Sequence, residues 1–290
     1  RIEHDLIGDK EISDECYYGV QTARAAENFH ITGVTLGSFP TFIESIAKVK
    51  KAAALANYEL HLLSEAKKNA IVEACEHIIS GKFHDQFVVD MIQGGAGTST
   101  NMNANEVIAN IGLESMGHPK GAYQFLHPNN DVNLSQSTND AYPTALRVAL
   151  YEKLGELSDS MRIIKDSFAK KASEFKDVIK MGRTQLQDAV PMSLEQEFRT
   201  YAVMIGEDIQ RVNEARQLVR EINMGATAIG TGINAHPDYA KTVEAKLQEV
   251  TGRPFVTAGD LVEATQDTGA YVQISGVLKR VSCVASTRSP

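Results

Sequence analysis

The chain has 290 residues, of which 43% are hydrophobic and 23% are charged, with a formal net charge of −8. This composition is that of a globular protein and argues against a disordered chain, and no apolar run is long enough to span a bilayer. The acidic balance argues against nucleic acid or an anionic membrane as a partner, because both attract basic surfaces.

The cysteines predict a reducing compartment. Cys16, Cys75 and Cys283 are odd in number, widely spread and without metal-type spacing, so we expect reduced and mostly buried thiols rather than a disulfide framework. No basic-then-apolar leader opens the sequence. We therefore expect a cytoplasmic protein.

Helical periodicity dominates the N-terminal half. After Pro40, Thr41 and Glu44 have the spacing of a capping box, and apolar residues then recur at helical intervals to Leu60. Ser64 is expected to start a second helix, which Gly81 would end.

Three longer helices are expected further along the chain. One runs from Ala141 to Phe175, and the second starts at a capping box of Ser193 and Gln196 and continues up to Gly225. The third is expected from about Thr257 into the low 280s. Helices of this length are typical of bundles.

We therefore predict an all-α fold. A mainly helical N-terminal domain is expected over residues 1–138, and a central long-helix bundle domain over residues 139–290.

Three polar segments interrupt the helical pattern, at residues 93–103, 136–140 and 182–189. Each places small residues and hydroxyls beside a predicted helix, an arrangement that exposes backbone N–H groups to an anion. Such residues also serve as ordinary caps and turns. A dinucleotide-binding loop is disfavoured, because no strand precedes the glycines and the third glycine of G-x-G-x-x-G is missing.

Together these segments resemble the signatures of the fumarase/aspartase superfamily. Order and spacing agree as far as about Cys283. The matching stretches are Gly95–Glu106, His127–Asn133 with Gln136–Asp140, Gly182–Pro191 and Gly225–Gly232.

Within that superfamily the details resemble the aspartases. Gln185, Ser137-Thr138-Asn139 and Gly225-Ala226-Thr227-Ala228 stand where fumarases carry His, Ser-Ser-Asn and Gly-Gly-Thr-Ala. The resemblance implies a carbon–nitrogen lyase that converts L-aspartate to fumarate and ammonia without a metal or other cofactor. A fumarase-type hydratase acting on malate and a catalytically inactive structural relative are the alternatives.

The resemblance also implies the residues that bind substrate. Removing the Cβ proton of aspartate delocalises charge onto the adjacent carboxylate, and hydrogen-bond donors aimed at its oxygens stabilise this aci form. The implied substrate-binding set is Thr98, Ser99, Ser137, Thr138, Asn139, Thr184 and Gln185.

The histidines divide into two groups. His127, Asn129, Asn130 and Asp131 lie in a segment that resembles a secondary carboxylate site of the fumarases, and a turn-stabilising role for His127 is the alternative. His77 and His84 lack a third ligand, so we expect no metal site there.

Family members continue with a Gly-Ser-Ser-x-Met-Pro-x-Lys-x-Asn loop, whose serine supplies the catalytic base. Nothing in this chain matches that loop, so the base is expected beyond residue 290 and the 290 residues alone are expected to release no ammonia. The Ser/Thr/Pro-rich end of the chain is expected to break the last helix.

Helix length predicts that the binding residues come from different subunits. The helix from Ala141 to Phe175 would be about 50 Å long, and the loop after it reaches back at most roughly 27 Å. Thr138 and Thr184 of one chain should then lie at least about 20 Å apart. We therefore predict a homo-oligomer with shared sites, and the resemblance implies a tetramer.

Overall fold

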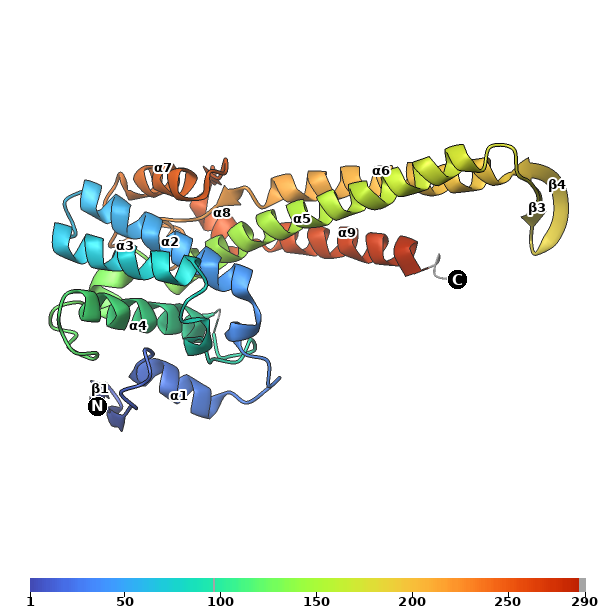
Figure 1. Ribbon diagram of the computed structural model, residues 1–290. Helices are drawn as coiled ribbons and strands as arrows, with labels where there is room; N and C mark the ends of the chain where they lie inside the picture. Colours follow the sequence, from blue (N-terminus) through green and yellow to red (C-terminus); the bar gives the residue numbers. More distant parts are fainter. Residues whose placement is uncertain (96, 287–290) are drawn as a thin grey trace. The chain divides into compact units, whose positions relative to one another are not determined.

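The computed structural model describes residues 1–95 and 97–286 of the chain (Figure 1). The chain divides into two compact units, a first unit of Arg1–Ala149 with Arg220–Asp267 and a second unit of Leu150–Val219 with Thr268–Pro290. This division differs from the predicted boundary between residues 138 and 139, because residues 220–267 return to the first unit.

The all-α prediction is confirmed. Within the described ranges, the elements are helices apart from three two-stranded sheets. No helix among those residues is both long enough and apolar enough to cross a membrane.

The first unit is built around α4, whose side chains are buried on nearly all faces from Thr100 to Leu113. Helix α4 packs against α1 and α3, and α2 packs against α3 and α7 (Figure 1). The α-helices of the first unit are α1 (Val20–Asn28), α2 (Pro40–Glu59), α3 (Glu65–Ile79), α4 (Thr98–Ser115), the start of α5 (Thr138–Glu174), α7 (Tyr239–Thr251) and α8 (Leu261–Gln266).

Short elements complete this unit. β1 (Ile2–Asp5) pairs antiparallel with β2 (Gly8–Glu11), and β5 (Glu221–Ile222) pairs parallel with β6 (Val256–Thr257). The single-turn helices are η1 (Leu36–Ser38), η2 (His84–Gln86) and the π-helical η3 (Pro128–Val132).

Of the two helix starts predicted in this unit, the one at Ser64 is confirmed and the one at Thr41 is not. Ser64 caps α3 by accepting a hydrogen bond from the Lys67 N–H, as expected, and Gly81 follows the helix with a φ of +90°. The capping box predicted at Thr41 is wrong. Helix α2 begins at Pro40 after Phe39, which makes no side-chain cap. Proline at the first position has no N–H to satisfy and already holds a helical φ, so Thr41 lies inside the first turn.

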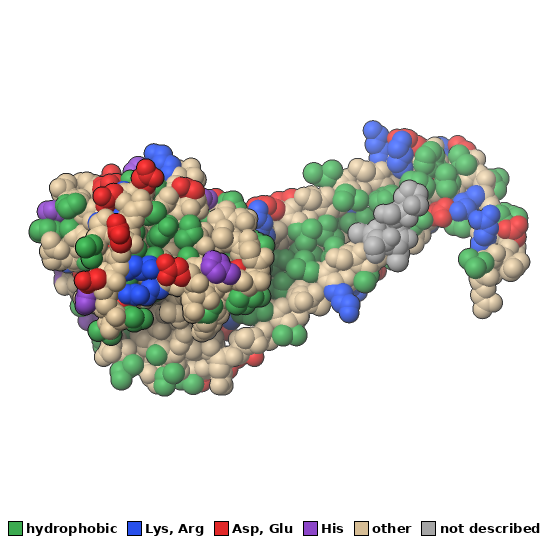
Figure 2. Space-filling model, turned by 90° about the horizontal axis from the view of Figure 1, so that it is seen from below, with side chains coloured by type: hydrophobic (Ala, Val, Ile, Leu, Met, Phe, Trp, Pro, Cys, Tyr) green, Lys and Arg blue, Asp and Glu red, His purple; other side chains and the backbone are tan. Residues whose placement is uncertain are grey.

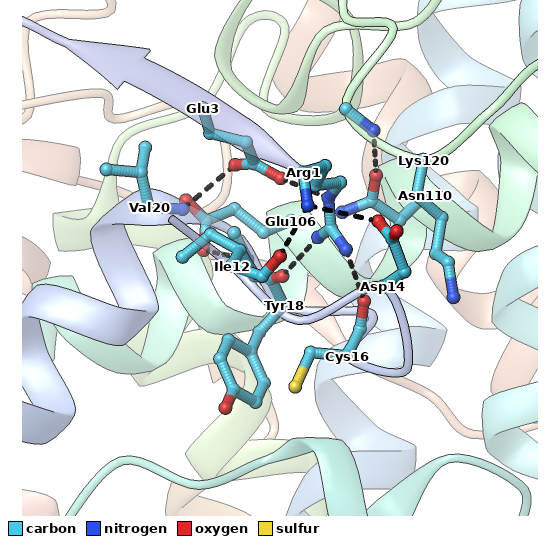
Figure 3. Close-up of polar contacts among 12 residues, drawn as sticks. Arg1, Glu3, Ile12, Asp14, Cys16, Tyr18, Val20, Glu106, Asn110 and Lys120 are labelled. Atoms are coloured by element: carbon cyan, nitrogen blue, oxygen red, sulfur yellow. Dashed lines mark hydrogen bonds and ion pairs between the residues drawn. The ribbon is translucent and has the colours of Figure 1, made fainter. Parts of the chain in front are cut away.

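Two buried carboxylates fix the N-terminal segment of the first unit (Figure 3). Glu106 of α4 accepts hydrogen bonds from the N–H groups of Gly19, Gln21 and Thr22, and therefore caps the start of α1 across the helix pair. Glu3 accepts from the Val20 N–H and pairs with the Arg1 guanidinium. Glu106 thus attaches α1 to the central helix, and Glu3 attaches α1 to β1.

The second unit contains α5 from Leu150 onwards, an antiparallel hairpin and two long helices. The hairpin strands are β3 (Ile179–Thr184) and β4 (Gln187–Ser193), and the helices are α6 (Leu194–Leu218) and α9 (Gly269–Ser286). Helices α6 and α9 pack against each other. The predicted capping box at the start of α6 is confirmed, with both Ser193 and Gln196 side chains bonded reciprocally.

Three predictions for the second half of the chain are corrected. Residues 182–189 form most of a β-hairpin rather than a loop, with a two-residue turn at Gln185 and Leu186. Helix α6 ends at Leu218 rather than near Gly225.

The third correction concerns the single helix predicted from Thr257, which is divided into α8 and α9. The side chain of Asp260 accepts hydrogen bonds from the N–H groups of Val262 and Glu263, which starts α8 as a separate helix. Extended backbone at Asp267 then ends α8 before α9 begins. The predicted helix-breaking tail at residues 287–290 lies outside the described residues.

Exposed apolar side chains accompany the long helices of the second unit (Figure 2). Their exposed fractions reach 70% at Ile163 and Val272 and 94% at Leu186 in the hairpin turn. Exposed apolar surface of this kind is typical of association sites.

Candidate functional site

The second polar segment forms the cap of α5. Ser137 Oγ accepts a hydrogen bond from the Asn139 N–H at 3.3 Å, and Asp140 Oδ1 accepts from the Ser137 N–H at 2.9 Å. This reciprocal arrangement holds Ser137 and Thr138 at the positive end of the helix dipole. Their hydroxyls are therefore placed where an anion is favoured.

Asp140 also joins this segment to residues 223–228. Its Oδ2 accepts from the N–H groups of Gly225 and Thr227 at 3.2 and 3.0 Å. Asn139 Nδ2 donates to the Ala228 carbonyl at 2.7 Å. Burial raises the pKa of Asp140 to about 7, while its backbone donors oppose that shift. The structure thus brings together two segments that are far apart in sequence.

The first polar segment meets the second at the start of α4. Asn101 Nδ2 donates to Thr138 Oγ1 at 3.1 Å. Gly97, with a φ of +90°, precedes α4, and a Cβ at this position would lie 2.4 Å from the Tyr142 ring of α5. Only glycine permits this close approach of the two helix starts. Thr98 is exposed and Ser99 half-buried beside this contact.

A buried lysine lies beneath these segments. The Lys50 side chain of α2 is 1% exposed, and its Nζ donates to Asn101 Oδ1, Asn133 Oδ1 and Gln136 Oε1 at 2.7, 2.8 and 3.0 Å. Burial lowers the pKa of Lys50 to about 7, and the nearby charge of Asp140 opposes that shift. Three acceptors match the three N–H donors of an ammonium group, so these surroundings complement the protonated lysine.

A cavity of about 600 Å³ lies beside Ser137 in the first unit. No charged side chain is among the residues that line it, which supply amides, hydroxyls and a few apolar groups. An anion there would be held by neutral donors and by the α5 dipole, which suits an acidic protein. The lining residues are Asn129, Asn130, Asn133, Leu134, Ser135, Gln136, Ser137, Thr227, Ala228, Ile233 and Asn234.

His127 has the geometry of a turn-stabilising residue. Its Nδ1 accepts hydrogen bonds from the N–H groups of Asn129 and Asn130 at 3.0 and 3.2 Å. Asp131 accepts from the His127 N–H and pairs with Lys67. Burial lowers the pKa of His127, which favours the neutral ring that can accept these bonds. A secondary carboxylate site at His127, Asn129, Asn130 and Asp131 stays a prediction.

The remaining predicted site residues belong to the second unit. Thr184 ends β3, and Gln185 begins the hairpin turn, where both side chains are exposed. The structure therefore gathers the first two polar segments and residues 225–232 in one unit and places the third polar segment in the other. The roles of all these residues in binding substrate stay predictions.

Neither His77 nor His84 lies in a metal-type cluster. In the described part of the chain, no group of three or more His, Cys, Asp or Glu side chains could hold a metal ion. His84 Nε2 is bonded to the Ile78 carbonyl at 2.8 Å. Within the described residues none of the three cysteines forms a disulfide; only Cys75 is fully buried, while Cys16 is half-buried and Cys283 exposed.

Sequence reasoning missed Lys50, Asn101 and Asp140 as organisers of the site. A signal for Lys50 was present, because it lies four residues after Ile46 and three before Ala53 on the apolar stripe of its helix. A charged residue on a buried stripe needs polar partners. Which partners it finds depends on contacts that only the folded chain makes.

Comparisons with known proteins agree with this architecture. The family model described as Lyase matches residues 8–286. Aspartate ammonia-lyase from Helicobacter pylori is 67% identical over 97% of this chain. A fumarate lyase/delta crystallin structure from Brucella melitensis matches 99% of this chain with a TM-score of 0.97 at 50% identity.

A class II fumarase structure from Schistosoma mansoni matches 98% of this chain with a TM-score of 0.93 at 30% identity. The matches span only part of these proteins. They cover 60% of the Helicobacter enzyme, 62% of the Brucella chain and 63% of the Schistosoma chain.

Proposed function

Because the chain belongs to this lyase family, we propose that its protein is an aspartate ammonia-lyase, which converts L-aspartate reversibly to fumarate and ammonia. The identity to the Helicobacter enzyme supports this reaction over the others of the family. A cytoplasmic location is part of the same proposal, and the lack of a disulfide among the described cysteines is consistent with it.

One observation carries the proposal. The hydroxyls of Ser137 and Thr138 lie at the N-terminus of α5, and Ser137 lines a cavity without charged side chains. A small dicarboxylate can be held there by hydroxyl and backbone N–H donors. Such a site favours an anion without requiring a cluster of lysines.

The same donors serve the chemistry. When a base removes the Cβ proton of aspartate, negative charge moves onto the oxygens of the adjacent carboxylate, and the Cα–N bond then breaks to release ammonia. Donors that hold those oxygens stabilise the aci-carboxylate more than the substrate, because its charge is larger. We assign this role to Ser137, Thr138 and Asn139, with Thr98 and Ser99 beside them.

We further propose that Thr184 and Gln185 reach the substrate from another copy of the chain, in a homotetramer. Helix α5 is a single helix of 37 residues, and at 1.5 Å per residue it is about 55 Å long. The hairpin that carries Thr184 follows the far end of this helix. The exposed apolar side chains of the second unit are consistent with association of copies.

The test uses the complete gene product that contains residues 1–290, supplied with aspartate or malate while fumarate absorbance is recorded. We expect fumarate and ammonia to form from aspartate, and Ser137→Ala and Thr184→Val to lower kcat/KM by roughly 100-fold each, as expected for the loss of a transition-state donor. Ser80→Ala, at the exposed end of α3, is the matched control and should leave kcat/KM unchanged.

Two results would replace the proposal. Fumarate formation from malate but not from aspartate would establish a hydratase, a function that the likeness to the Schistosoma fumarase keeps open. No turnover of either compound would favour an inactive structural relative.

A further inference from the structure

We propose that Lys50 is a positioning residue for Thr138: through the side-chain amide of Asn101, it leaves the Thr138 hydroxyl proton free for the bound carboxylate. This inference rests on the proposed function, because it assumes that Thr138 binds a dicarboxylate. Lys50 itself touches no substrate in this arrangement and acts only through Asn101.

The first step concerns the direction of the Asn101 amide. The ammonium group of a lysine can donate hydrogen bonds but cannot accept them. The atom of Asn101 that lies 2.7 Å from Lys50 Nζ must therefore be the oxygen Oδ1. The NH₂ group of Asn101 consequently points away from Lys50.

The second step concerns the Thr138 hydroxyl. Asn101 Nδ2 lies 3.1 Å from Thr138 Oγ1 and 3.1 Å from Asn133 Oδ1, so it donates to both oxygens. The Thr138 oxygen then acts as an acceptor towards Asn101. Its own proton has no acceptor in the hydrogen bonds of the described residues and is free for a ligand.

The third step concerns rigidity. Asn101 is 4% exposed, and the other two acceptors of Lys50 are also held on their far sides. Asn133 Nδ2 donates to the Gln136 carbonyl, and Gln136 Nε2 donates to the carbonyls of Val132 and Leu134. If any of these three side-chain amides flipped, both its oxygen and its NH₂ group would lose their hydrogen bonds. The direction of the Thr138 hydroxyl is therefore set before a ligand arrives.

A purely structural role for Lys50 is the competing explanation. In that case the ammonium would balance the buried charge of Asp140 and fill the core, and the direction of the Asn101 amide would not affect ligand binding. The two explanations differ in whether changes at Asn101 act through the Thr138 hydroxyl. A double-mutant cycle measures this directly.

Asn101→Asp is the most informative variant, because it keeps the shape of the side chain and the bond to Lys50 while replacing the NH₂ donor by an oxygen. The Thr138 hydroxyl would then donate to the new carboxylate and lose its proton as a ligand donor. The added negative charge also repels an anion. That repulsion acts equally in a Thr138→Val background, so only the difference between the two backgrounds reports the hydroxyl.

The probe is succinate, an unreactive dicarboxylate, titrated by calorimetry into the complete gene product that contains this chain. We expect Asn101→Asp to weaken succinate binding by about 100-fold in the parent protein and by less than about 5-fold in the Thr138→Val background. Lys50→Met should show the same dependence on Thr138. If Lys50→Met does not fold, Asn101→Asp carries the test.

Several results would overturn the inference. An equal loss of affinity in both backgrounds would mean that Asn101 acts by charge or structure alone. Unchanged binding in Asn101→Asp, or no succinate binding by the parent protein, would also sink it. Turnover of aspartate and malate is measured in parallel, so a parent protein that binds succinate but forms no fumarate would contradict the proposed function and leave the positioning result standing.

Discussion

Two regions that carry predicted site residues are organised in opposite ways. Residues 133–140 meet residues 223–228 at a contact that we call the buried junction. It is held by the buried side chains of Lys50 and Asp140 and by backbone N–H groups that donate to Asp140. The β3–β4 hairpin, residues 179–193, has exposed side chains over most of its length, and its ion pair between Arg183 and Asp188 is exposed on both partners.

The difference indicates that donors in the buried junction are set in place by one chain, whereas the hairpin is attached to α6 near its base and exposes its turn. Its apolar residues Met181, Leu186 and Val190 are exposed to between 40% and 94%. In the proposed oligomer a neighbouring copy would cover them. The two regions should therefore respond differently to mutation, pH and association.

The largest effect is expected from Asp140→Ala in the buried junction. This change leaves the N–H groups of Ser137, Gly225 and Thr227 without their acceptor and removes the negative charge that favours protonated Lys50. We expect the free energy of unfolding in urea to fall by roughly 3–5 kcal/mol.

The matched control is Asp159→Ala, whose exposed carboxylate pairs with Arg162, and we expect it to change stability by less than about 0.5 kcal/mol. Similar losses for both variants would contradict a special role of the buried junction.

The buried junction should also produce a stability minimum near pH 7. The pKa of Asp140 is raised by burial to about 7, so the folded chain holds a proton that the unfolded chain releases above about pH 4, and stability falls as pH rises towards 7. Burial lowers the pKa of Lys50 to about 7 in the folded chain. Above that pH Lys50 is neutral in the folded chain but still protonated in the unfolded chain, so stability rises towards pH 10.

Each limb has a slope of at most about 1.4 kcal/mol per pH unit. Urea unfolding at a series of pH values should show Asp140→Asn flattening the acid limb and Lys50→Met flattening the alkaline limb. A minimum that persists in both variants would assign it to other groups.

A smaller effect is expected at the hairpin turn, where Leu186 has a φ of +67°. Leu186→Gly relieves the left-handed strain of a branched residue and should stabilise the isolated hairpin by about 1 kcal/mol, seen as slower hydrogen exchange of β3 and β4. If a neighbouring copy covers Leu186, the same change weakens association in analytical ultracentrifugation.

Leu6→Gly is the matched control, since Leu6 is an equally exposed leucine in the β1–β2 turn and is not at a positive φ. It should neither stabilise its hairpin nor affect association. If Leu6→Gly and Leu186→Gly had the same effect on hydrogen exchange and on association, the β3–β4 turn would be neither strained nor an association site.

The smallest effects are expected at Ser193 and Thr41, which were both predicted to cap a helix start. Ser193 caps α6 at the end of the hairpin, and Ser193→Ala should cost about 1 kcal/mol in thermal unfolding. Thr41→Ala should cost less than about 0.5 kcal/mol, because Thr41 makes no cap on α2. A larger loss for Thr41→Ala would show that the helix start differs from the one described.

The sequence alone was sufficient for the helical class, for the starts of α3 and α6 and for the long α5. Apolar spacing and caps are local signals, so they identify such helices before any tertiary contact forms. The predicted residues Ser137, Thr138 and Asn139 also lie in one unit with the first polar segment and with residues 225–232. Their order along the chain and their match to a known family selected them, and their role in binding stays a prediction.

The tertiary structure decided the hairpin, the interruption before α9 and the polar surroundings of Lys50. The turn at Gln185 and Leu186 lacks the Asn-Gly signal of a two-residue hairpin, and α8 is separated from α9 by the Asp260 cap and by extended backbone at Asp267. Lys50 and Asp140 are 90 positions apart in sequence number, and local patterns carry no information about which distant amides and N–H groups will surround a buried charge. That pairing arises only when separate helices meet, because a charge excluded from water must find its partners among whatever the fold brings to it.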